Sequence, residues 1–180
     1  MKTQFFFGLA LILTPLFTSA QVSGYDPEAL SKAGETIATF MDKDSKFEIY
    51  FEEAYAYIVF PSIGKGASVI GGARGKGTAY ELGTPIGKAT LTQITLGFQF
   101  GGQAYSQVIF FETEEDFQRF KDHKLEFAAE ASVAAITTGA GASLNYSDGV
   151  AVFTKTKGGL MYEAVLGGQR IKYKPNQTIN

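Results

Sequence analysis

Residues 90–100 read TLTQITLGFQF, and this stretch has the clearest strand pattern in the chain. Apolar and polar side chains alternate along it, with one set made of Ile94, Leu96, Phe98 and Phe100 and the other of Gln93, Thr95 and Gln99. An alternation of period two is typical of a strand that has one face in a core and the other in solvent. The stretch therefore predicts a β-strand whose Gln and Thr side chains lie on the polar face.

Strand-like segments lie on both sides of this stretch. They are residues 56–60, which end at Pro61, the glycine-interrupted segments 67–72 and 77–81, and then 104–111, 151–155, 160–166 and 171–174. Residues 128–136 are rich in Ala and suit either a helix or a tightly packed strand. We expect these strands to pair mostly as antiparallel neighbours.

Helices are expected at the start of the chain and near its middle. An N-cap candidate, a first-turn Pro and an acid follow one another at Asp26, Pro27 and Glu28. Apolar residues then recur at helical spacing, which predicts helices over 27–42 and 45–54. Thr113 to Asp116 resembles a capping box that opens a third helix. The expected fold class is α+β, with a largely antiparallel, glycine-rich β-sheet or barrel-like core and N-terminal and mid-chain helices.

Glycine is concentrated in the strand-rich parts of the chain. Of the 21 glycines, eleven lie in residues 61–110 and seven in residues 139–168. At strand ends or inside strands, glycine permits turns, bulges and the close approach of backbone to backbone or to a ligand.

The first twenty residues have the pattern of a secretory signal peptide. Lys2 precedes an apolar run over residues 5–13, and small residues at 18–20 suit cleavage before Gln21. The apolar run is shorter than the roughly 20 residues that span a bilayer. We therefore expect export to the periplasm or the extracellular space, and a single domain over residues 21–180.

Composition excludes several kinds of site. The chain has no Cys, which removes disulfides, thiolate metal sites, cysteine nucleophiles and lipidation at cysteine. A single histidine, His123, cannot form a His-rich metal site. The net charge of −2 argues against a general nucleic-acid binder, which needs a broad basic face. We expect no metal, no cofactor and no nucleic-acid partner.

The residues that catalysis could use are poorly placed for it. His123 stands between Asp122 and Lys124 in what resembles an exposed helix end, and no G-x-S-x-G motif accompanies it. Several carboxylates cluster at helix starts and on faces expected to be solvated: Glu48, Glu52, Glu53, Glu112, Glu114 and Glu115. We therefore expect a protein that is not an enzyme, and a hydrolase with an unrecognised site is the weakest alternative.

Two glycine-rich segments resemble nucleotide-binding loops only in part. Residues 64–69 read GKGASV, which lacks the third glycine of a G-x-G-x-x-G motif and leads into a strand. Gly75-Lys76 resembles the end of a P-loop, but Ile70 replaces its first glycine and Gly77 its Ser or Thr. Neither segment predicts a nucleotide site.

Basic residues form two groups in the strand-rich parts of the chain. The first group interrupts the first glycine block, and the second repeats at every other position opposite Ile171 and Tyr173. Lys and Arg beside backbone amides that glycine leaves accessible suit oxyanions such as phosphate headgroups. The alternative is that these cations only keep edge strands from pairing. The groups are Lys65, Arg74, Lys76 and Lys88, and Arg170, Lys172 and Lys174.

Several segments together resemble the SYLF-domain family. In chain order they are YIVFPSIGKG at 57–66, IGGARGKG at 70–77, GFQFGGQ at 97–103, ASVAA at 131–135 and KGGL at 157–160. Each segment alone is a weak signal, whereas their succession over about residues 28–174 is fairly specific.

The resemblance implies a lipid-binding module. Eukaryotic members of the family are associated with phosphoinositide membranes, and fungal members with actin filaments, whereas many bacterial members are exported single-domain proteins. Lys65, Arg74 and Lys76 fall in the matching basic, glycine-rich segment. This chain lacks the companion domains of the eukaryotic members, and its first predicted helix is acidic. An exported protein does not meet cytoplasmic actin, so actin is not an expected partner.

The sequence thus predicts a non-enzymatic module that binds anionic phospholipid or phosphoinositide-like headgroups. The expected ligand-binding residues are Lys65, Arg74, Lys76 and Lys88. The alternative is a small outer-membrane β-barrel, or a structural envelope protein without a specific ligand, to which the signal peptide, high glycine content and aromatic strands are also suited. The predicted helices argue against that alternative.

Overall fold

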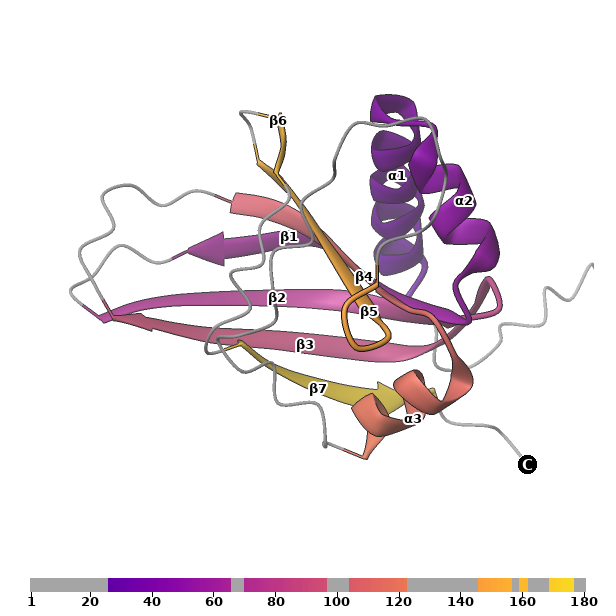
Figure 1. Cartoon of the computed structure of the whole chain (residues 1–180). Coiled ribbons are helices and arrows are strands. Elements are labelled where there is room, and N and C mark those ends of the chain that lie inside the picture. Colours follow the sequence, from indigo (N-terminus) through magenta and orange to yellow (C-terminus); the bar gives the residue numbers. More distant parts are fainter. Residues whose placement is uncertain are drawn as a thin grey trace, which may run out of the picture.

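The computed structural model of the chain describes residues 26–65, 70–96, 104–122, 146–156, 159–161 and 169–176. These residues form helices and a β-sheet (Figure 1). The elements are α1 (Pro27–Lys43), α2 (Lys46–Glu53), β1 (Ala56–Lys65), β2 (Ile70–Glu81), β3 (Thr84–Leu96), β4 (Ala104–Phe111), α3 (Glu114–Lys121), β5 (Val150–Thr156), β6 (Gly159–Met161) and β7 (Gln169–Pro175). His123 and the Ala-rich segment 128–136 lie outside the described residues, as does the predicted signal peptide.

The helices begin where local sequence signals place them. At α1 the Asp26 carboxylate accepts hydrogen bonds from the backbone N–H groups of Glu28 (3.1 Å) and Ala29 (3.4 Å). At α3 the predicted capping box is present, because the Thr113 hydroxyl and the Asp116 carboxylate each bond to the other residue's backbone N–H. The side chains of Asp26, Thr113 and Asp116 thus accept hydrogen bonds from backbone N–H groups at the helix starts, which have no partner within the helix.

The seven described strands form one antiparallel sheet in the order β6-β5-β4-β1-β2-β3-β7. This confirms the α+β class and the antiparallel pairing. The sheet is not closed by the described strands, because β6 and β7 stand at its two ends without pairing to each other. The described strands therefore form an open, curved sheet rather than the barrel-like core that was the other expectation.

Strand β2 corrects one prediction. Glycines were expected to break this region into two strands at 67–72 and 77–81, but Ile70–Glu81 is continuous. A Cβ atom on Gly75 would lie 2.6 Å from Cγ1 of Ile63, and one on Gly77 would lie 2.6 Å from the backbone oxygen of Val59. These glycines allow the close approach of β1 and β2, so they belong to the strand and do not interrupt it.

Strand β1 corrects a second prediction. It was expected to end at Pro61, but it continues to Lys65. Its pairing shifts register between Val59 and Ser62 against β2, and between Phe60 and Ile63 against β4. A bulge is a position where Pro, which lacks the N–H group, is tolerated within a sheet.

The sheet has an apolar layer on each face. On one face, which we call the inner face, side chains such as Ile58, Phe60 and Phe111 pack against Phe117 and Phe120 of α3. On the other, the outer face, α1 and α2 pack on the sheet (Figure 1). The main sheet residues beneath those helices are Tyr57, Val59, Tyr80, Val108, Phe110, Ala151 and Phe153.

Gln93 belongs to the polar set of residues 90–100, yet it is only 3% exposed. Its side-chain oxygen accepts a hydrogen bond of 3.3 Å from the hydroxyl of Tyr105 on β4, and a further bond of 3.2 Å joins Gln107 to Gln169. Two strands separate β3 from β4 in the sheet, so in a flat sheet these strands would lie about 14 Å apart. The sheet therefore curls around its inner face and buries Gln93 inside the curve.

Candidate anion-binding face

Two predicted site residues lie on the outer face of β2. Arg74 and Lys76 are exposed, whereas Ala73 and Gly75, which alternate with them, are buried on the inner face. The alternation follows from strand geometry, since successive side chains point to opposite faces. Arg74 and Lys76 thus project from one surface, as their spacing predicted.

Strand pairing extends this surface across β3 to β7. Residues that are directly opposite each other in neighbouring strands have side chains on the same face. The registers of the β2–β3 and β3–β7 pairs therefore define three rows. The rows are Arg74–Thr92–Arg170, Lys76–Thr90–Lys172 and Thr78–Lys88–Lys174. We call the surface formed by these rows the basic face.

The basic face carries six cations and no acidic residue in its rows. All six side chains are exposed, and within the described part of the chain none of them forms an ion pair. With a rise of about 3.3 Å per residue and about 4.8 Å between strands, the cations cover roughly 13 Å by 10 Å. Such a surface can contact several oxyanions at once.

The four predicted site residues have different outcomes. Arg74, Lys76 and Lys88 lie together on the basic face. The backbone of Lys65 pairs opposite Ala73, next to the pair Gly64–Arg74, but the Lys65 side chain lies outside the described residues.

The cations of β7 were absent from the predicted site. Their alternation with Ile171 and Tyr173 was visible in the sequence and is confirmed, because Ile171 is buried while Arg170, Lys172 and Lys174 are exposed. What the sequence did not show is that β7 pairs with β3. That pairing places Lys174 opposite Lys88 and brings the two basic groups onto one surface.

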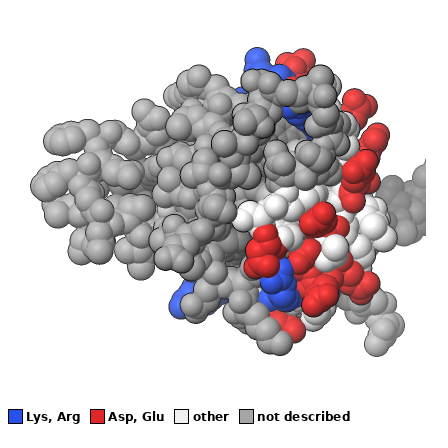
Figure 2. Space-filling view, viewed as in Figure 1, with Lys and Arg blue, Asp and Glu red and all other residues white. Residues whose placement is uncertain are grey.

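Carboxylates gather elsewhere on the molecule. Figure 2 shows Asp and Glu side chains concentrated on the side where α2 and α3 lie. We call this surface the acidic end, and its exposed members are Glu48, Glu52, Glu53, Glu112, Glu114, Glu115 and Asp148. The six glutamates of this end are exposed to solvent, as the sequence predicted.

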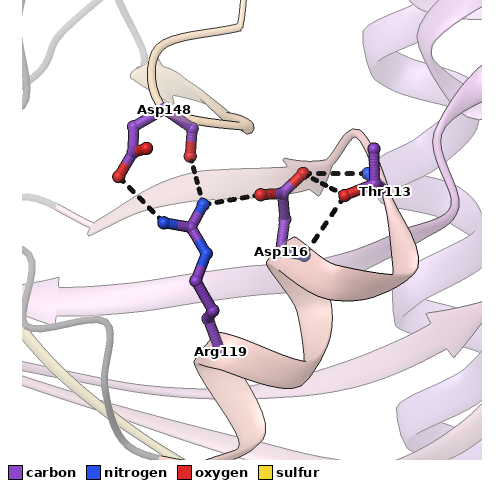
Figure 3. A network of polar contacts seen from close by, with 4 residues as sticks. All are labelled: Thr113, Asp116, Arg119 and Asp148. Atoms are coloured by element: carbon purple, nitrogen blue, oxygen red, sulfur yellow. Dashed lines mark hydrogen bonds and ion pairs between the residues drawn. The ribbon is translucent and has the colours of Figure 1, made fainter.

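One arginine at the acidic end is held by a network of polar contacts (Figure 3). The Arg119 guanidinium pairs with Asp116 on α3, and donates to the Asp148 carboxylate (3.2 Å) and backbone oxygen (2.9 Å). Burial acts to raise the pKa of Asp116, but hydrogen bonds from Thr113 and Arg119 outweigh burial and hold the pKa below its ordinary value. The network ties α3 to the turn before β5, which is a structural role.

Neither metal nor nucleotide chemistry is indicated by the described residues. Over these ranges, no three His, Cys, Asp or Glu residues come together in a way that could hold a metal ion. Gly75 and Lys76 lie inside β2, and not at the start of a helix where a P-loop would bind phosphate. Among the helices described above, none combines the length and the apolar character that crossing a membrane requires.

Comparison with known proteins points to the expected family. Residues 92–178 match the family described as Las17-binding protein actin regulator (Ysc84), and this segment includes β4 to β7. The chain is also 28% identical over 141 residues to Beta cell expansion factor A of Aeromonas veronii, covering 77% of this chain and 53% of that protein. The chain thus spans about half the length of that relative. The resemblance to the SYLF-domain family is confirmed, and residues 92–178 carry its Ysc84-type domain match.

Proposed function

We propose that this protein binds the headgroups of anionic phospholipids through the basic face. A lipid-binding type of module agrees with the family match. The observation that carries the finer proposal is the set of three rows on β2, β3 and β7, which present six exposed cations without any carboxylate among them. An exposed cluster of one sign, whose cations form no ion pair with any residue that the structure describes, is suited to an anionic surface.

The need to protect an edge strand from pairing with another chain explains only some of the cations on the basic face. Lysines on an edge strand prevent it from pairing with another chain, and β7 is at the edge of the described sheet. Strands β2 and β3, however, each have a partner on both sides. Arg74, Lys76 and Lys88 therefore protect no edge, and a ligand is the better explanation for their position.

The expected strength of binding follows from the number of cations. Near the surface of an anionic membrane each Lys or Arg contributes about 1 kcal/mol, and salt screens this attraction over a Debye length of about 10 Å at 0.1 M. Six cations can thus produce stable but salt-sensitive binding. We do not assign Lys65 to the basic face, because its backbone pairs with Ala73, a residue of the inner face.

The expected partner is a membrane surface outside the cytoplasm. The predicted signal peptide directs the chain to export, so we propose a periplasmic or extracellular lipid as ligand. The matched family is described as an actin regulator. We do not extend that description to this chain, because an exported protein and cytoplasmic actin occupy different compartments.

Co-sedimentation with vesicles tests the proposal. The wild-type protein should pellet with vesicles of phosphatidylcholine mixed with phosphatidylglycerol, and remain in solution with phosphatidylcholine alone. The variant Arg74→Glu/Lys76→Glu/Lys88→Glu should stay in solution with both. A matched control, Lys32→Glu/Lys43→Glu/Lys46→Glu on α1 and α2, changes the net charge equally and should still pellet. Equal loss in both triple variants would show that net charge matters and the basic face does not.

A further inference from the structure

A hollow lies on the outer face of the sheet beside α1, at the bulge of β1. Its volume is about 360 Å³, which is within the range of small-molecule sites. Thr39 of α1 lines one side, Ser62 lies at the bulge, and Ser106 and Lys155 come from β4 and β5. Among the residues that the structure describes, none that lines the hollow is acidic.

The bulge shapes the hollow. The regular pairing of β1 is interrupted between Val59 and Ser62 against β2, and between Phe60 and Ile63 against β4, so the strand bends there. The hydroxyl of Ser106 donates a hydrogen bond of 2.8 Å to the backbone oxygen of Pro61, which fixes the bulged backbone against β4. The wall of the hollow is therefore built into the sheet.

Lys155 is the charged residue of the hollow. Its side chain is half-buried, and within the described ranges it has no ion-pair partner. Partial burial of an ammonium group costs free energy unless an opposite charge or hydrogen-bond acceptors compensate for it. The Ser62 hydroxyl lines the same hollow and can donate to the same acceptor, whereas the Thr39 hydroxyl donates to the backbone oxygen of Glu35 (2.6 Å). Lysine with a serine hydroxyl and no carboxylate among the described lining residues is a donor set that suits an oxyanion.

The hollow is continuous with the basic face. Lys155 is opposite Ser106 in the β5–β4 pair, and Ser62 is opposite Lys76 in the β1–β2 pair. Lys76 in turn begins the row that crosses β3 to Lys172. An anion seated in the hollow would thus lie next to the cations of the basic face and on the same side of the sheet.

We propose that this hollow is a phosphate subsite, in which Lys155 and the Ser62 hydroxyl bind one phosphate group while the basic face contacts the surrounding anionic surface. The inference rests on the proposed headgroup binding and adds a specific pocket to it. The shared chemistry is a phosphate ester, which can belong to a phospholipid headgroup or to a soluble molecule. Phosphatidylglycerol vesicles and free glycerol 3-phosphate are the probes that separate these two sources.

The decisive comparison is between Lys155→Met, which keeps the length of the side chain, and Lys155→Arg, which keeps its charge. A charge-assisted hydrogen bond contributes enough that Lys155→Met should weaken binding to phosphatidylglycerol vesicles about tenfold. Lys155→Arg should restore most of that loss, and Ser62→Ala should cause a smaller loss. Lys43→Met, an exposed lysine at the end of α1, is the matched control and should bind as the wild type does. Circular dichroism and the Tm confirm that each variant is folded.

The outcomes separate the subsite from the basic face. If Lys155→Met binds vesicles as tightly as Lys43→Met while the basic-face variant does not bind, the subsite is wrong and the proposed function stands. If glycerol 3-phosphate binds in a Lys155-dependent manner, measured by NMR titration, but vesicles do not pellet, the subsite stands for a soluble phosphate ester and the proposed membrane function fails. If Lys155→Met weakens vesicle binding but glycerol 3-phosphate does not bind, the subsite is supported and the phosphate that it binds belongs to a lipid headgroup. Binding of neither probe by the wild type overturns the subsite.

Discussion

The basic face and the acidic end use charged side chains in opposite ways. On the basic face, cations such as Arg74 and Lys172 lie in rows and form no ion pair within the described residues. At the acidic end, Arg119 is paired with both Asp116 and Asp148. Paired charges hold this fold together, whereas unpaired charges of one sign remain available to a ligand. The position of a charge, and not the net charge of −2, therefore indicates its role.

Charge reversal on β7 should have the largest effect. Arg170→Glu/Lys172→Glu/Lys174→Glu removes three exposed cations of the basic face. At about 1 kcal/mol for each cation, the affinity for phosphatidylglycerol vesicles should fall at least 100-fold. Vesicle co-sedimentation measures this loss. Unchanged binding would mean that β7 is not part of the site and that its cations only protect an edge.

Gly149→Ala should have the largest effect on stability at the acidic end. Gly149 has a φ of +73°, which L side chains rarely adopt, and a Cβ atom there would collide with the Asp116 carboxylate. The free energy of unfolding should therefore fall by about 2–3 kcal/mol, as measured by urea denaturation.

Gly34→Ala is the matched control for that substitution. Gly34 lies in α1, and a Cβ atom there would meet no atom within 4 Å. The control should raise the free energy of unfolding by about 0.5–1 kcal/mol, because Ala favours a helix more than Gly does. A similar effect of both substitutions would contradict the fit of Asp116 against Gly149.

Arg119→Met tests whether the paired charges of the acidic end act on stability alone, without an effect on ligand binding. It removes the partner of Asp116, a carboxylate whose residue is only 8% exposed, so the free energy of unfolding should fall by about 1–2 kcal/mol. Vesicle binding at temperatures where the protein is folded should not change. Weaker binding by folded Arg119→Met would show that the acidic end also takes part in ligand binding.

Lowering the pH should reduce the free energy of unfolding through Asp116, and this is the smallest effect that we predict. Because the pKa of Asp116 is lowered in the folded protein, its contribution to stability is complete well above the ordinary value of 3.8 and is lost as pH falls through the folded pKa. Asp116→Asn cannot lose a proton and should unfold with less dependence on pH in this range. Urea denaturation of both proteins between neutral and acidic pH provides the measurement. Identical pH dependence would show that the network does not depend on the charge of Asp116.

Local signals in the sequence predicted the helices well. The Asp26 cap and the Thr113 capping box act within one helical turn, so the residues that form them are neighbours in the chain. The alternation of exposed cations with buried residues in β7 is equally local. Features of this kind can be predicted because the cause and the structure lie in the same short segment.

Features that depend on distant partners could not be predicted from the sequence. The glycine-rich run before residue 77 was taken as a break between two strands, because the reason for glycine at Gly75 and Gly77 is contact with β1, which another segment supplies. The burial of Gln93 was not predicted, because the Tyr105 hydroxyl reaches it only after the sheet curls.

The candidate site shows the same division. Arg74 and Lys76 were placed on one surface from their spacing alone, whereas the pairing of Lys88 with Lys174 joins positions that are far apart in the chain. The bulge at Ser62 was missed for the related reason that Pro61 was taken as the end of β1. Its signal was the Pro-Ser pair inside an otherwise strand-like run, which is compatible with a bulge as well as with a strand end.

The segregation of charge gives the molecule an electric dipole moment. An anionic surface exerts a torque on such a dipole, which turns the basic face toward the surface and the acidic end away from it. Because the field extends only about a Debye length into solution, this reorientation happens within about the last 10 Å of approach. Capture from solution would then occur in one orientation, with α3 directed outward and free of the lipid.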